Sequence, residues 1–159
     1  MNRLTTTTLN NVSTGQFGTT FDTTVGAVST TNVYDAAGNI VQQIDGRGNS
    51  VFTFYNKTGQ KIAQVDQEGY LTAYDRDADG NVLTETRYAT RLSTSILTAS
   101  DPAALRTNAG STSDDRITSF TYDRNGRRLT ETRSGVVAST VSATGVLSTS
   151  TQSATVSYP

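Results

Sequence analysis

Residues 32–55 read NVYDAAGNIVQQIDGRGNSVFTFY, and this stretch decides the fold. It holds two polar turns, Asp35-Ala36-Ala37-Gly38 and Asp45-Gly46-Arg47-Gly48, that are flanked by segments rich in Val, Ile, Phe and Tyr. Glycine adopts a positive φ without steric penalty, and an Asp side chain accepts a hydrogen bond from the backbone two residues on. Turns about every ten residues between β-rich segments are typical of an antiparallel meander. The stretch therefore predicts short β-hairpins.

The same turns recur along the chain. Tyr-Asp-x-x-Gly returns unchanged at Tyr122. In the copy at Tyr55, Asn replaces Asp, and in the copy at Tyr74, two extra residues precede the glycine. The five residues from Leu83 also recur identically from Leu129. We expect the chain to be nearly all strand and turn. The repeat positions are Tyr34, Asp35, Gly38, Asp45, Gly48, Tyr55, Gly59, Asp66, Gly69, Tyr74, Asp75, Gly80, Tyr122, Asp123 and Gly126.

Composition narrows the possible functions. The chain has 159 residues, of which 34% are hydrophobic, and it contains neither His nor Cys. Most zinc, haem and iron–sulfur sites are therefore excluded, as are Ser–His and Cys–His nucleophiles. The net charge of −1 argues against nucleic acid. There is no apolar run of the ~20 residues that a membrane-spanning helix needs, and no signal peptide is visible.

The hydrophobic core implied by this composition is thin. We expect regular backbone pairing, neighbouring repeats or identical copies to supply the missing stability.

Tyr-Asp-x-x-Gly followed by a second Asp-x-x-Gly turn resembles the YD repeat, also called the RHS repeat, of large bacterial surface and toxin proteins. The resemblance covers residues 32–88 and 116–133. It implies an all-β fold in which hairpin ribbons form a partial or closed shell around a toxic domain, or serve surface display. It also implies an extracellular or cell-surface location and a structural role without cofactors.

Other parts of the chain depart from the repeat. Residues 1–31 are a Thr/Ser-rich lead-in, either short strands or flexible, and residues 32–91 are repeat hairpins. Residues 92–115 form an insertion in which Ser100 or Asp101 caps a short helix that begins with Pro102. Residues 116–134 are a further hairpin. Residues 135–159 are Ser/Thr-rich strands around a turn at Gly145, in an array that we expect to be truncated.

Acidic residues offer one candidate metal site. Asp75, Asp77 and Asp79 before Gly80 match the opening of several calcium loops, although Thr86 stands where an EF-hand has Glu. The alternative is an acidic, lengthened hairpin tip. Among other charged residues, we expect cross-strand ion pairs from Glu85 and Arg87 and from Glu131 and Arg133, and solvated charges at Asp114 and Asp115.

Two alternatives concern the tyrosines and the Asp101-Pro102 bond. Tyr34, Tyr55, Tyr74 and Tyr122 either pack over their own hairpins, which we favour, or form an aromatic surface that stacks sugars. RHS proteins carry an Asp-Pro self-cleavage motif, but at Asp101 helix capping is the simpler interpretation.

Three functions follow from these patterns. The first is a non-catalytic structural segment of a secreted or surface RHS-type protein, acting as shell wall or spacer. The second is a subunit that assembles into an extracellular filament through strand edges or ends. The third is an adhesin module that binds glycans or a cell-surface receptor.

Overall fold

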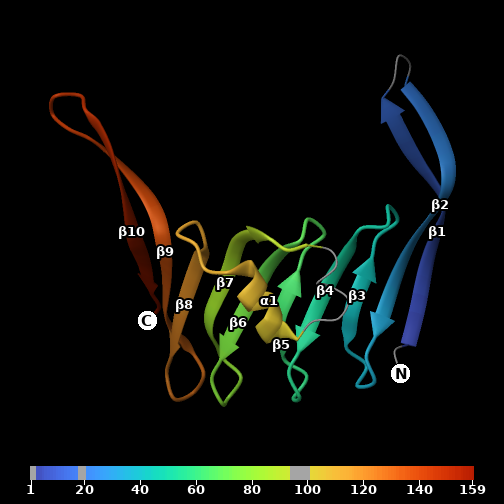
Figure 1. The fold of residues 1–159 in the computed structure, drawn as a ribbon, viewed down its shortest axis with the longest axis horizontal. Coiled ribbons are helices and arrows are strands. Elements are labelled where there is room, and N and C mark those ends of the chain that lie inside the picture. The colour runs from blue at the N-terminus through green and yellow to red at the C-terminus, as the bar shows by residue number, and fades with distance from the viewer. Residues whose placement is uncertain (1–2, 18–20, 94–100) are drawn as a thin grey trace.

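The computed structural model describes residues 3–17, 21–93 and 101–159. Its strands form one antiparallel sheet of ten strands, whose order in space is their order in the sequence (Figure 1). The all-β fold expected from the turns is confirmed. The strands are β1 (Arg3–Phe17), β2 (Phe21–Tyr34), β3 (Ile40–Ile44), β4 (Ser50–Tyr55), β5 (Lys61–Val65), β6 (Tyr70–Arg76), β7 (Val82–Arg91), β8 (Arg116–Tyr122), β9 (Arg128–Val141) and β10 (Leu147–Ser157).

Seven of the connections between these strands share one five-residue turn. In the first, the Gly38 N–H donates to the Asp35 carbonyl over 3.2 Å, and the Asp35 N–H donates to the Asn39 carbonyl over 3.0 Å. The fourth residue of every such turn is a glycine with a φ between 76° and 93°. This left-handed conformation explains the glycine spacing in the sequence. The turns begin at Asp35, Asp45, Asn56, Asp66, Asp77, Asp123 and Ser142.

The fourth Tyr-Asp copy corrects one expectation. Its turn starts at Asp77 and ends at Asn81, so it has the same length as the others. The two extra residues lengthen strand β6 and leave the hairpin tip unchanged, and Asp75 lies within the strand opposite Thr84. The physical reason is that Asp77, three residues before Gly80, is correctly placed to accept from the turn backbone.

A short helix, α1 (Pro102–Ala109), packs on one face of the sheet over β6 and β7, as expected from the sequence (Figure 1). The Asp101 carboxylate caps it by accepting from the Ala103 N–H over 3.1 Å. Leu105 and Ala109, one turn apart, are buried in a cluster with Leu71 and other apolar residues of the sheet. Within the described residues, no helix is long and apolar enough to cross a membrane.

The insertion returns to the sheet through Asp115, which was expected to be solvated. Its side chain is instead buried and accepts from the Ala89 N–H over 2.8 Å and from the N–H and hydroxyl of Thr112, each over 3.0 Å. Burial alone would raise the pKa of this carboxyl, but the hydrogen bonds outweigh it and lower the pKa. Asp115 therefore fastens the insertion to β7.

The two ends of the chain form long hairpins that rise beyond the central strands (Figure 1). Strand β2 runs past residue 31 to Tyr34, and β9 runs past residues 134 and 135 to Val141. The register shifts between Leu9 and Val12 and between Gln152 and Ala154. Such bulges bend a strand and increase its twist. Residues 3–17 and 21–31 of the lead-in are thus strand, and the C-terminal strands are longer than expected.

Candidate functional site

The turns after β2, β4, β6 and β8 stand in one row along the sheet. A Cβ atom on Gly59 would lie 3.8 Å from the Asn39 side-chain oxygen, and one on Gly126 would lie 3.7 Å from that of Asn81. Each of these glycines therefore faces the last residue of the preceding turn in the row. The repeat glycines thus supply the positive φ of each turn and also allow successive turns of the row to lie close together.

The residue before a turn ties one hairpin to the previous one. The Tyr122 hydroxyl donates to the Val82 carbonyl over 2.9 Å, and the Arg76 Nε donates to the Lys61 carbonyl over 3.0 Å. Val82 and Lys61 are each the first residue after the preceding turn of the row. Arg76 thus takes the tyrosine's place in the fourth copy, a role that the repeat pattern had assigned to Tyr74.

The other tyrosines also contact neighbouring strands. The Tyr74 ring lies 4.9 Å from Lys61 Nζ, and the Tyr34 ring lies 5.1 Å from the Arg3 guanidinium. These cation–π contacts occupy a face of each ring. All four repeat tyrosines, Tyr34, Tyr55, Tyr74 and Tyr122, are half-buried. Packing therefore accounts for three of them, and sugar stacking at these rings stays a prediction.

The three carboxylates considered for calcium have separate surroundings. Asp77 accepts from the Asp79 N–H over 3.0 Å and from the backbone and side chain of Asn81 over 2.8 and 2.9 Å. Asp75 forms a 2.8 Å ion pair with Arg106 of α1. Asp79 lies at the exposed turn tip. In the described part of the chain, no three acidic side chains form a group that would hold a metal ion. Calcium binding at this turn stays a prediction.

Four turn carboxylates, those of Asp35, Asp45, Asp77 and Asp123, have lowered pKa values. At Asp35, Asp45 and Asp77 the main cause is the side-chain amide of the Asn that ends each turn. At Asp123 the backbone N–H of Arg127 lowers the pKa most, followed by its side chain. These carboxylates stabilise the turns through those hydrogen bonds.

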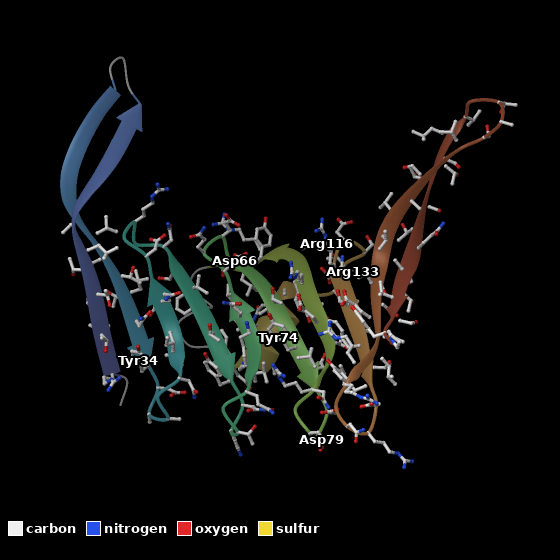
Figure 2. All side chains as sticks on the ribbon, turned by 180° about the vertical axis from the view of Figure 1, so that it is seen from behind. Tyr34, Asp66, Tyr74, Asp79, Arg116 and Arg133 are labelled. Atoms are coloured by element: carbon white, nitrogen blue, oxygen red, sulfur yellow. The ribbon has the colours of Figure 1, made fainter. Side chains whose placement is uncertain are left out.

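Charged residues line an open groove of about 570 Å³ over β7, β8 and β9. Figure 2 shows Arg116 and Arg133 on this side of the sheet, which is opposite α1. Arg87 pairs with Glu85 over 2.7 Å, and Arg133 pairs with Glu131 over 2.9 Å. These ion pairs run along one strand, so the expected cross-strand pairing was wrong. The side chains on one face of a strand are two residues apart and within reach of each other.

The outermost strands, β1 and β10, leave two sheet edges open. Apart from Arg3 at the start of β1, the strands β1 and β10 contain no Asp, Glu, Lys, Arg or Pro. Natural proteins commonly place charges or proline on edge strands to prevent further pairing. Beyond Arg3 these residues are missing here, and Leu147 and Val156 of β10 are 64% and 55% exposed. The two edges are therefore the candidate functional site.

A scan against protein-family models and a search of curated proteins each find no match to this chain. The geometry of the sheet therefore carries the functional argument.

Proposed function

We propose that the chain is a non-catalytic structural segment of a secreted or surface RHS-type protein, in which it acts as shell wall or spacer. The observation that carries this proposal is a single meander of ten strands whose two edge strands contain one charged residue, Arg3, and no proline. Its repeated turns and hairpin-to-hairpin bonds fit a wall built by adding hairpins.

Strand direction supports continuation at both ends. The ten strands alternate in direction, so the start of β1 and the end of β10 lie at the same end of the strands (Figure 1). A strand placed after Ser157 by a short turn would run antiparallel to β10, and one placed before Arg3 would run antiparallel to β1. Further hairpins at either end would therefore preserve the existing hydrogen-bonding pattern.

The small core gives a physical reason for such neighbours. Among the described residues, the buried cluster consists of a few side chains beneath α1, with Leu71, Leu105 and Val65 as its largest fully buried members. Helix α1 lies over β6 and β7, away from the terminal hairpins (Figure 1). A two-stranded hairpin alone is at best marginally stable in water. Pairing at the edges would stabilise them.

Hydrogen–deuterium exchange on two copies joined in tandem tests this proposal. The four residues Tyr158, Pro159, Met1 and Asn2 would connect β10 to the next β1, a length suited to a hairpin. We expect the amides of β10 in the first copy and β1 in the second to exchange more slowly than in the single chain. Equal exchange in both chains would contradict the proposal.

A second candidate, assembly of identical copies into a filament, is favoured by the same edges, in which Arg3 is the one charged residue of β1 and β10. β10 of one copy and β1 of another can pair antiparallel and leave the opposite edges open. Head-to-tail contacts of this kind do not close and so produce filaments.

A further inference from the structure

We propose that Asn125 is a site of spontaneous deamidation whose rate is limited by opening of the turn that Asp123 holds. Asn125 is exposed and lies in the middle of the turn between β8 and β9. It is the one asparagine of the chain that is followed by glycine. The inference concerns the covalent chemistry of the chain, and it is independent of the structural function proposed above.

Glycine after asparagine favours this reaction, because no side chain shields the backbone nitrogen of Gly126. That nitrogen attacks the Cγ atom of Asn125, its proton passes to the side-chain nitrogen, and ammonia leaves. The product is a cyclic succinimide that joins residues 125 and 126. Water then adds to one of the two ring carbonyls and opens the ring. Attack at one carbonyl gives aspartate, and attack at the other gives isoaspartate.

The asparagines that end a repeated turn have tied side chains, whereas that of Asn125 is untied. The amides that donate to a turn carboxylate are those of Asn39, Asn49 and Asn81, over 2.9, 3.0 and 2.9 Å. At Asn125 the backbone N–H donates to the Asp123 carboxylate over 2.9 Å, but the side chain forms no hydrogen bond with the described residues. The Asn125 side chain can therefore rotate toward the Gly126 nitrogen.

Backbone hydrogen bonds oppose the reaction while the turn is closed. The Gly126 N–H donates to the Asp123 carbonyl over 3.1 Å, and this bond must break before the nitrogen can attack. The Asp123 carboxylate keeps the turn closed by accepting from the N–H groups of Asn125 and Arg127 over 2.9 and 2.8 Å. Deamidation therefore requires the turn to open, and its rate should depend on Asp123.

The products would disturb the row of turns. Isoaspartate adds one methylene to the backbone of a turn whose length is the same throughout the row. Asn125 and Asp123 also line one groove with Asp77 and Asp79 of the preceding turn in the row. A carboxylate at position 125 would face three others, and like charges repel. Deamidation should thus weaken the contact between the β6–β7 and β8–β9 turns.

Incubation of the full chain in mildly alkaline buffer tests the site. Peptide mass spectrometry detects the replacement of NH2 by OH at each asparagine, and labelling by an isoaspartate methyltransferase detects isoaspartate. The test variant is Asp123→Ala, and Asp123→Asn keeps a side-chain oxygen that can hold the turn. The matched control is Asp45→Ala, which removes the equivalent carboxylate from the β3–β4 turn. Thermal melting of each variant reports separately on folding.

We expect conversion at Asn125 in the unaltered chain and no comparable conversion at Asn39, Asn49 or Asn81. Asp123→Ala should accelerate it about tenfold, because two hydrogen bonds that close the turn are lost. Asp123→Asn and Asp45→Ala should convert Asn125 at nearly the rate of the unaltered chain. No conversion at Asn125, equal conversion at the asparagines that end turns, or the same rate in Asp123→Ala and Asp45→Ala would each overturn the proposal.

Discussion

The pair formed by Asp35 and Gly38 shows how two residues determine a hairpin. The carboxylate of Asp35 accepts from the N–H groups of Ala37 and Asn39 over 2.9 and 2.8 Å, and Gly38 supplies the positive φ that closes the turn. All of these contacts lie within five residues, so the sequence alone predicted them. The same reasoning applies at Ser142, where a hydroxyl accepts from the Val146 N–H over 3.1 Å.

The turn carboxylates make stability depend on pH. The pKa values of Asp35, Asp45, Asp77 and Asp123 are lowered from 3.8 in the folded chain, so their contribution is complete above that value and lost as the pH falls through the folded pKa values. We expect the urea midpoint to be constant between about pH 7 and pH 5 and to fall below about pH 4.

A variant in which all four are Asn supplies the control for this pH dependence. Asn56 already holds a turn of the same kind through its side-chain oxygen. The fall below pH 4 should become smaller in the variant, whereas an identical acid profile would show that other carboxyls control it.

Gly38 allows the effect of backbone conformation to be measured alone. Its φ is 91°, and a Cβ atom there would meet nothing within 4 Å. Gly38→Ala should therefore lower the free energy of unfolding by about 1 kcal/mol through backbone strain alone. Gly38→Asn should cost less, because Asn tolerates the left-handed region better. Urea denaturation measures both, and equal losses would argue against this explanation.

Residues whose partners are distant in sequence were harder to predict. Arg76 donates to the Lys61 carbonyl on the neighbouring strand β5, 15 positions away, and Asp115 accepts from the Ala89 N–H, 26 positions away. Neither contact leaves a local pattern in the sequence. The equivalence of Arg76 with the repeat tyrosine could nevertheless have been recognised, because an alignment of the turns on Asp77 places Arg76 at the tyrosine position.

Helix α1 was predictable in its location but not in its role. Its cap and proline are local features, whereas its position over β6 and β7 depends on Leu105 and on Arg106, which also donates to the Tyr74 carbonyl over 3.3 Å. The helix supplies the cover under which the largest buried side chains meet. It is the element on which the stability of the central sheet depends.

Truncation of Leu105 tests this dependence. Its side chain is fully buried, so Leu105→Ala should lower the free energy of unfolding by about 2–5 kcal/mol. The same change at Leu147, which is 64% exposed, should cost less than about 0.5 kcal/mol. Chemical denaturation compares the two variants. A similar loss at both positions would mean that α1 does not form the main core.

The secondary structure of the terminal hairpins could not be fully predicted from the sequence. Thr- and Ser-rich segments with sparse apolar residues fit both strands and flexible chain, so residues 1–31 remained undecided. In the described residues 3–17 and 21–31, the pairing of β1 with β2, interrupted by one register shift, decides in favour of strand. Hydroxyl pairs join β1 to β2, for example Thr6 with Thr31 at 3.1 Å and Thr8 with Ser29 at 2.9 Å. The Thr- and Ser-rich composition thus supports strand pairing.

At the scale of the whole molecule, the turn spacing predicted a meander but not that all ten strands belong to one sheet. The insertion in residues 92–115 suggested a break in the array. Instead β7 pairs with β8 directly, from Thr84 with Ser119 to Arg87 with Arg116. The sheet is continuous because α1, in the described part of the insertion, packs on its face and leaves the edges of β7 and β8 free to pair.

Sedimentation velocity over a range of concentrations tests most directly whether both edges of this sheet accept further strands. The chain should associate as concentration rises. A variant with Thr7→Lys in β1 and Thr151→Lys in β10 should remain a monomer, because charged edge residues oppose pairing. A control with Ala37→Lys and Ala78→Lys at two turn tips carries the same added charge and should associate like the unaltered chain. A monomer at every concentration, or equal association of the edge variant and the unaltered chain, would contradict the account.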